Sequence, residues 1–306
     1  MSDERPSLKP YSTPSANDSS FHALTRLWTP WRMRYVGGGA PNACVFCDKL
    51  AERNDSSALI LHRGKRSFTV MNLFPYNTGH ILLVPNAHVA GPEETDVATL
   101  AEMSTSVPLL LRALRRVLAN DGFNIGVNVG SVAGAGIAAH LHQHIVPRWN
   151  GDANFMPILA STMVLPELIP TTYAKIRAEL CALTQPHQEI LTVVFDLGRT
   201  KVLIRKVGGG WALPQRLPSQ DEPAWHTARN ATGLPSENID ILGWAGSDEA
   251  NDYSRNALFA SLNGQPLTSD AFVATDEAFN RLTDENHRVA LRTAIARANP
   301  LPQSTP

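Results

Sequence analysis

The sequence has few cysteines, almost no net charge and no apolar run long enough to cross a bilayer. Only three of the 306 residues are cysteine, so no disulfide framework is indicated. Lys and Arg number 27 against 28 Asp and Glu, a formal net charge of −1. Such a chain offers no basic field to a polymeric nucleic acid. Its apolar runs fall short of the ~20 residues of a membrane span, and the first ten residues lack a signal-peptide core. We therefore expect a cytoplasmic protein with no membrane or polymeric nucleic-acid partner.

The length accommodates one large domain or two ordinary ones. Residues 1–20 are rich in Ser, Pro, Asp and Asn, which predicts a disordered tail. Gln185-Pro186-His187 has the composition of a boundary, and strand-like segments begin again after it. We therefore predict one domain over residues 21–185 and a second over residues 186–306.

Strands and one long helix are expected in the first domain. Residues 67–71 and 81–84 form strand patterns on either side of a turn, as in a hairpin. Between residues 94 and 120 apolar side chains recur at helical spacing. Pro108 should kink or split that helix, and residues 123–129 should form the next strand. The pattern predicts an α+β domain with an antiparallel sheet backed by helices.

Three histidines occupy every second position near the middle of the chain: His140, His142 and His144. In a strand these side chains would share one face, and Leu141 and Ile145 would point to the other. A histidine-rich surface strand is the ordinary alternative. Strict alternation of three histidines behind the glycine-rich segment 128–136 favours a functional site instead.

Imidazole is suited to chemistry at phosphorus because it titrates near neutrality. A neutral imidazole can attack phosphorus and form a covalent phospho-histidine or nucleotidyl-histidine. Neighbouring histidines can fix its tautomer, bind a metal, or donate a hydrogen bond to a phosphate oxygen. A glycine-rich loop lets backbone N–H groups approach an anion. The stretch therefore predicts phosphoryl or nucleotidyl transfer.

The motif His-x-His-x-His, followed by two apolar residues and preceded by an Asn-x-Gly loop, resembles the histidine triad (HIT) family. Two longer stretches resemble its diadenosine tetraphosphate phosphorylase (ATP adenylyltransferase) branch: HLHQHIVPRWNGDANFM from His140 and LWTPWRMRY from Leu27. The resemblance covers about residues 25–180. It implies a HIT-like antiparallel sheet and phosphorolysis or hydrolysis of dinucleoside polyphosphates such as diadenosine tetraphosphate. Inorganic phosphate would then be a co-substrate of the phosphorolysis. We also expect a homodimer.

The resemblance assigns a role to each histidine of the triad. His142 would be the nucleophile that carries the nucleotidyl group. His144 would donate to phosphate oxygens, and His140 would orient the strand or bind zinc. Ile137 stands where HIT hydrolases commonly carry a hydroxyl. The choice between phosphate and water as acceptor therefore stays open.

Nucleotide and phosphate contacts are implied for five further residues: Asn72, Asn128, Gly134, Gly136 and Trp149. Asn128, the glycines and neighbouring N–H groups would stabilise negative charge. Asn72 would contact the ribose hydroxyls, because an amide both donates and accepts; alternatively it caps a turn. Trp149 would contact phosphate, or it is a core tryptophan.

Cys44-Val45-Phe46-Cys47 is half of a zinc site, a redox pair, or a pair of buried thiols. Zinc needs four ligands, usually Cys and His. The HIT resemblance places the other two ligands at His88 and His140, which would complete a structural zinc site.

The second domain resembles a Nudix domain over about residues 188–300, which implies an α/β/α sandwich. Strands at residues 189–195 and 201–205 precede a helix at 223–232, in which ARNATGL stands where the Nudix box ends. The positions of the three box glutamates hold Thr227, Asn230 and Ala231 instead. Divalent metals need several carboxylates there, so we assign this half no hydrolase site.

Two other functions compete with the phosphorylase or hydrolase reading. The first is a nucleotidyltransferase that uses a sugar phosphate as acceptor. The second is a non-catalytic nucleotide sensor; the intact triad argues against it and the eroded Nudix box argues for it. The products formed from diadenosine tetraphosphate with and without inorganic phosphate distinguish all three.

Overall fold

The computed structural model describes residues 44–152, 167–249, 254–263 and 272–298. The predicted tail at residues 1–20, the stretch from Leu27 and residues 153–156 lie outside these ranges. The described residues all belong to one compact unit, which spans Gly39–Asp152 and Val164–Pro306.

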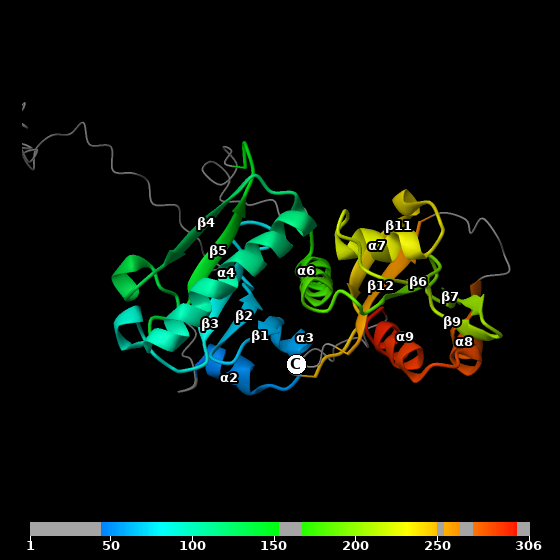
Figure 1. Cartoon of the computed structure of the whole chain (residues 1–306), viewed down its shortest axis with the longest axis horizontal. Coiled ribbons are helices and arrows are strands. Elements are labelled where there is room, and N and C mark those ends of the chain that lie inside the picture. The colour runs from blue at the N-terminus through cyan, green and yellow to red at the C-terminus, as the bar shows by residue number, and fades with distance from the viewer. Residues whose placement is uncertain (1–43, 153–166, 250–253, 264–271, 299–306) are drawn as a thin grey trace, which may run out of the picture. The chain divides into compact units, whose positions relative to one another are not determined.

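The first half contains a five-stranded antiparallel sheet with strand order β1-β2-β3-β5-β4 (Figure 1). Its strands are β1 (Ile60–Arg63), β2 (Ser67–Met71), β3 (Ile81–Pro85), β4 (Gly122–Val127) and β5 (Gln143–Arg148). The strands predicted at residues 67–71 and 81–84 are confirmed, since β2 and β3 pair directly. Because β5 inserts between β3 and β4, the strand that contains His144 is an interior strand of the sheet, next to the edge strand β4. The helical segments of this half are α2 (Val45–Ala51), α3 (Asp55–Ala58), η1 (Pro92–Glu94), α4 (Val97–Leu118) and η2 (Ser131–Ala133).

The long helix α4 is continuous through Pro108, so the predicted split at that residue is wrong. Proline leaves the carbonyl of the residue four positions earlier without a helical donor. Here that residue is Ser104, and both Ser104 and Pro108 are exposed. Water can therefore solvate the orphan carbonyl at little cost. By length and composition α4 could also cross a membrane, but one such helix is weak evidence because core helices pass the same test.

The second half contains a six-stranded sheet with strand order β11-β12-β6-β7-β13, and β10 pairs with β6. Its strands are β6 (Ile190–Phe195), β7 (Lys201–Leu203), β10 (Gln215–Arg216), β11 (Ile239–Trp244), β12 (Asn256–Leu262) and β13 (Phe272–Ala274). A separate hairpin joins β8 (Arg205–Val207) and β9 (Gly210–Ala212). The helical segments are α6 (Ile169–Thr184), α7 (Ala224–Ala231), η3 (Ser236–Asn238), α8 (Thr275–Arg281) and α9 (Glu285–Ala298).

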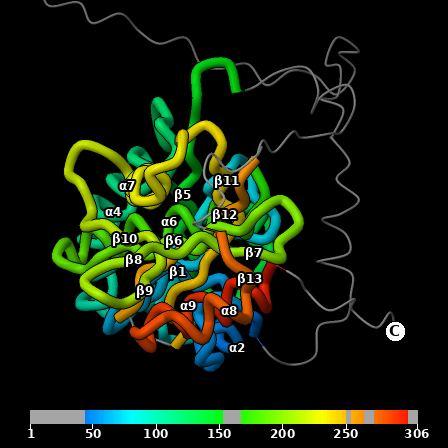
Figure 2. Tube along the Cα trace, turned by 90° about the vertical axis from the view of Figure 1, so that its right-hand side faces the viewer, coloured from blue at the N-terminus to red at the C-terminus, as the bar shows by residue number. Residues whose placement is uncertain are grey.

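Helices cover both faces of this second sheet. Side chains of β6 alternate between two apolar clusters: Ile190 and Val194 pack with α6 and α7, while Val193 and Phe195 pack with α8 and α9. Figures 1 and 2 show α7 and α9 on opposite sides of the sheet. The result is an α/β/α arrangement, as predicted for this half; its relation to Nudix proteins stays a prediction.

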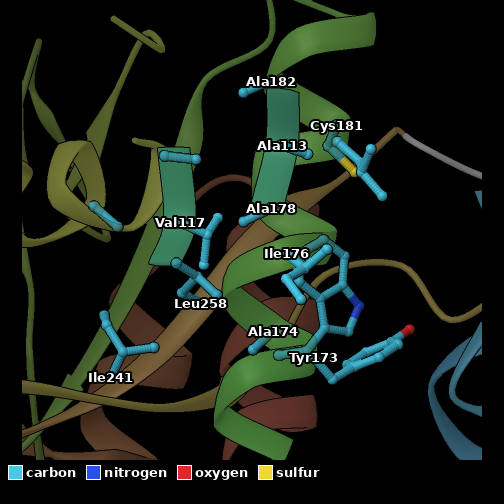
Figure 3. Packing of buried hydrophobic residues seen from close by; sticks show 14 of the residues in the cluster. Ala113, Val117, Tyr173, Ala174, Ile176, Ala178, Cys181, Ala182, Ile241 and Leu258 are labelled. Carbon is cyan, nitrogen blue, oxygen red and sulfur yellow. The ribbon is translucent and has the colours of Figure 1, made fainter. Parts of the chain in front are cut away.

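Helix α6 packs against elements of both halves. It contacts α4 and β1 on the side of the first sheet and β11, β12 and α7 on the side of the second. Ala174, Ala178 and Ala182 form a stripe of small side chains along it (Figure 3), which permits close packing. One hydrophobic cluster therefore continues from Ile81 of the first sheet to Leu258 of the second. Residues 185–187 lie in the connection between α6 and β6, and a domain boundary there stays a prediction.

Candidate functional site

The triad histidines do not all lie in one strand. Strand β5 begins at Gln143, so His144 is in the strand and His140 and His142 precede it. The predicted strand over all three is wrong, because the backbone upstream of Gln143 bonds elsewhere. The Leu141 N–H donates to the Val89 carbonyl at 2.6 Å, and the His140 carbonyl accepts from the His142 side chain.

The hydrogen bond of His142 determines where its proton sits. Nδ1 lies 2.8 Å from the His140 carbonyl oxygen, which can only accept. Neutral His142 therefore carries its proton on Nδ1 and keeps a lone pair on Nε2. The side chain is buried, and burial lowers its pKa while the bond to the carbonyl opposes that shift. His142 is thus neutral at neutral pH, with a nucleophilic nitrogen at Nε2.

A fourth histidine, His80, fixes the tautomer of His144. The sequence did not predict a role for it. His80 Nδ1 lies 3.1 Å from the Tyr76 backbone nitrogen, which can only donate, so Nδ1 accepts. Neutral His80 therefore carries its proton on Nε2, 3.0 Å from His144 Nδ1. That bond leaves the proton of neutral His144 on Nε2. His142 and His144 thus have opposite tautomers, one with a free Nε2 lone pair and the other with an Nε2–H donor.

His80 is completely buried between the turn and the sheet. Burial, and then the nearby His144 and His142, lower the pKa of His80 to about 3. A neutral His80 is what the donor chain to His144 requires. Its position directly before the buried strand β3 was the one available signal in the sequence, and a single histidine there is weak.

The four predicted metal ligands lie together. The ligand atoms of Cys44, Cys47, His88 and His140 all fall within 4.8 Å of one another. Cys44 Sγ is 3.3 Å and Cys47 Sγ 3.7 Å from His140 Nδ1, and Cys47 Sγ is 3.3 Å from His88 Nδ1. Tetrahedral zinc, with bonds of about 2.0–2.3 Å, separates its ligand atoms by roughly 3.3–3.8 Å. The set is therefore compatible with a zinc ion.

His140 is oriented for such an ion by a carbonyl. Its Nε2 donates to the Pro85 carbonyl at 2.9 Å, so neutral His140 turns a bare Nδ1 toward the thiols. A second hydrogen bond of this kind is the usual support of a metal-binding histidine. His140 is buried, and burial lowers its pKa, which favours the neutral form that binds metal.

Phe46 is a further residue that sequence reasoning missed. It lies between the two cysteines in α2 and is buried. Its ring packs edge-on against His140 at 5.4 Å between centroids and contacts His142 at 5.3 Å. The Cys-x-x-Cys helix therefore touches the triad as well as the metal set.

The glycine-rich segment before the triad is exposed. Gly130 and Gly134 have φ of 77° and 87°, which favours glycine, and an added Cβ would meet nothing within 4 Å at either residue. Backbone conformation rather than crowding therefore accounts for these two glycines. Asn128 is half-buried at the end of β4 and Gly136 is exposed.

Of the residues predicted to contact the nucleotide, Asn72 lies beside His80, and Trp149 lies farther along the chain from His144. The Asn72 side-chain amide is 3.2 Å from His80 Nδ1, and its Oδ1 accepts from the Phe74 N–H, which makes it a turn cap. Trp149 is half-buried and follows β5, five residues or roughly 16 Å of extended chain beyond His144. The ribose contact of Asn72 and the phosphate contact of Trp149 stay predictions.

Comparison with known proteins places the site in a family. The HIT domain model matches residues 53–151. The AP-4-A phosphorylase of Mycobacterium tuberculosis H37Rv is 38% identical over 157 residues, which cover 49% of this chain and 80% of that protein. The chain belongs to the HIT family.

Two further similar proteins share less sequence identity with this chain. Adenylylsulfatase HINT3 of Arabidopsis thaliana is 35% identical over 111 residues, 36% of this chain and 55% of that protein. A Zn-bound histidine triad family protein from Mycobacterium smegmatis is 27% identical, with a TM-score of 0.39. That match covers 46% of this HIT chain and 96% of the solved one.

Proposed function

We propose that this HIT protein transfers a nucleotidyl group from a dinucleoside polyphosphate, such as diadenosine tetraphosphate, to phosphate or water through a covalent intermediate on His142. The observation that carries the proposal is the 2.8 Å bond from His142 Nδ1 to the His140 carbonyl. It leaves the Nε2 lone pair as the nucleophile. The similarity to AP-4-A phosphorylase supports this class of substrate.

In the first step His142 Nε2 attacks a nucleotide phosphorus. The N–P bond forms, the P–O bond to the polyphosphate breaks, and that oxygen leaves with the electron pair. The imidazole then carries a positive charge, which its Nδ1–H shares with the His140 carbonyl. His144 donates from Nε2 to a phosphate oxygen, because His80 fixes its proton there. Preorganised donors of this kind stabilise charge that develops during the reaction.

In the second step an oxygen of phosphate or water attacks the same phosphorus and the N–P bond breaks; when water is the acceptor, it releases one proton to solvent as the P–O bond forms. The His142 ring returns to its neutral form, since Nε2 regains its lone pair and Nδ1 keeps its proton. Backbone N–H groups of residues 130–136 and the Asn128 side chain supply further donors for the phosphate oxygens.

We propose that the cysteine and histidine set binds one structural zinc ion. Four protein ligands leave no open position, so the ion stabilises the fold and takes no part in the transfer. Cys44, Cys47, His88 and His140 would hold it. The His140 carbonyl accepts the hydrogen bond from His142, and the His140 ring would bind the metal. The ion would thereby fix the residue that orients the nucleophile.

A second copy of the chain is the protein partner that we propose. Among the described strands, β4 is at the edge of the first sheet, and an edge strand offers backbone groups for pairing. Ile125 and Val127 of β4 are 43% and 37% exposed. They line an apolar groove of about 410 Å³ together with Met103 and Val107 of α4. Pairing of two β4 edges would cover these side chains in both copies.

The second half contributes no hydrolysis in this proposal. Of the three eroded box positions, Thr227 and Asn230 each donate to the carboxylate of Glu222, at 3.0 and 2.7 Å. Both oxygens of that carboxylate are engaged within the protein, and the third position, Ala231, offers no ligand. A Nudix-like fold without its metal ligands is suited to binding or docking.

Product analysis tests the proposed transfer. Diadenosine tetraphosphate, incubated with isotope-labelled phosphate, should yield ATP and labelled ADP if phosphate is the acceptor, and ATP and AMP if water is. Turnover that requires an added sugar phosphate would identify the sugar-phosphate transferase. Binding without any product would identify the sensor and contradict the proposal.

A further inference from the structure

The seven-residue helix α2 and its N-cap carry three side chains of the site. Cys44 is its N-cap, Cys47 lies in its first turn, and Phe46 packs on His140 and His142. A helix this short is not stable by itself. Tertiary contacts must therefore fix its position, and at its C-terminal end one side chain binds two of its carbonyls.

Arg63 of β1 binds the end of α2 opposite the cysteines. Its guanidinium donates to the Leu50 carbonyl at 2.7 Å and to the Glu52 carbonyl at 2.6 Å. These are carbonyls at the C-terminal end of a helix, which have no helical donor. The Arg63 side chain is 7% exposed, so water does not replace these bonds easily.

The buried carboxylate of Asp55 orients Arg63. Asp55 Oδ1 accepts from Arg63 Nε at 2.7 Å, and Oδ2 accepts from Arg177 of α6 at 3.1 Å. Asp55 and Arg177 are both fully buried. Arg177 also donates to the Leu61 carbonyl at 2.5 Å, and the Asp55 N–H donates to the Asp248 carbonyl at 2.7 Å. The cluster therefore connects α2 with α6 and with the second half.

Stability alone is a poor reason for such a cluster. Desolvation of buried charges offsets much of their attraction, and apolar replacements are often neutral or stabilising. A guanidinium held by a carboxylate does give a fixed direction, because its planar fork binds several acceptors at once. Here the fork binds two backbone carbonyls and Asp55.

We infer that Arg63, oriented by Asp55, is a positioning residue that sets α2 so that both cysteines reach His88 and His140. The inference rests on the proposed zinc set. It also gives the second half a role: through Arg177 and Asp248 it supports the element that carries two of the metal ligands.

The test compares Arg63→Lys with Arg66→Lys in the full chain. Lysine keeps the charge but cannot reproduce the fork, while Arg66 is a half-exposed arginine that forms a surface ion pair with Asp96. Zinc affinity is measured by competition with a chelator. The free energy of unfolding is measured for the zinc-bound and metal-free forms. We expect Arg63→Lys to weaken zinc binding about 10- to 100-fold, as for other residues that support metal ligands, and Arg66→Lys to leave it unchanged.

The two forms of the protein separate positioning from simple stability. If Arg63 positions α2, the extra stability that zinc confers shrinks in Arg63→Lys. Equal destabilisation of both forms, with wild-type zinc affinity, would overturn the inference and leave the zinc assignment intact. Wild-type protein that binds no zinc would overturn the zinc assignment and the inference with it. Should Arg63→Lys fail to fold, Arg63→Gln, which keeps a side-chain N–H donor but lacks the guanidinium fork, is measured in the same way; wild-type zinc affinity there contradicts the inference.

Discussion

Acid should destabilise this protein through His80. The side chain is completely buried, and its pKa is lowered from 6.5 to about 3 in the folded state. Unfolded His80 therefore binds a proton at pH values where the folded residue does not. Stability rises with pH wherever the unfolded state binds more protons. The contribution of His80 is accordingly complete above pH 6.5 and is lost as pH falls from 6.5 toward 3.

The magnitude follows from the size of the shift. Each pH unit between the two pKa values changes the free energy of unfolding by about 1.4 kcal/mol. From pH 6.5 to pH 5 the loss due to His80 is therefore roughly 2 kcal/mol. The full window down to pH 3 would give roughly 5 kcal/mol, but other groups titrate strongly there, so pH 5 is the better limit.

Urea unfolding at several pH values between 8 and 5 measures this contribution. His80→Gln keeps a hydrogen-bonding side chain that does not titrate, so its free energy of unfolding should fall by about 2 kcal/mol less than wild type over that range. His187→Gln, a change of an exposed histidine, controls for the substitution itself. Parallel pH profiles for wild type and His80→Gln would show that folding does not lower the pKa of His80, and the reasoning from its burial would then be refuted.

Three further predictions follow from the site. Metal analysis of protein purified without chelator should find one zinc per chain, and Cys47→Ser should lower both this content and the unfolding temperature; zinc near zero in wild type sinks the metal set. Full-length His142→Ala, assayed with Mg²⁺ or Mn²⁺, should hydrolyse no nucleoside diphosphate-linked substrate, since α7 carries no carboxylate; metal-dependent turnover would reveal ligands in the second half. The acid limb of kcat/KM should lie below pH 6.5, because burial lowers the pKa of His142 and the neutral ring is the nucleophile; a limb above pH 6.5 contradicts that assignment.

Local patterns predicted the first sheet well. Residues 67–71 and 81–84 are strongly apolar strands joined by a turn, and pairing along the chain is enough to form β2 and β3. The prediction of a strand over His140 and His142 was wrong, and the alternation of side chains along a strand could not show why. A side chain, His142 Nδ1, takes the backbone acceptor that a ladder would have used.

Contacts between distant parts of the chain were harder to predict. His80 meets His144 only after β5 inserts beside β3. Arg177 and Glu179 of α6 are charged, and charged side chains are expected at the surface, yet both are completely buried. Arg177 binds Asp55, and Glu179 binds Arg116. These ion pairs let α6 pack on both sheets. The boundary-like composition of residues 185–187 did not indicate that the two halves would share this helix.

Covalent trapping tests the central proposal most directly. Wild-type protein mixed with diadenosine tetraphosphate and quenched in alkali, where an N–P bond to histidine survives, should yield one peptide that carries an adenylyl group on His142. His142→Ala should yield no adduct. Its turnover rate should fall by far more than the ~10²- to 10⁴-fold typical of the loss of a general acid–base group. An adduct on another residue, or a His142→Ala protein that keeps even about a tenth of wild-type turnover, far above the residual rate that loss of a nucleophile allows, would contradict the account.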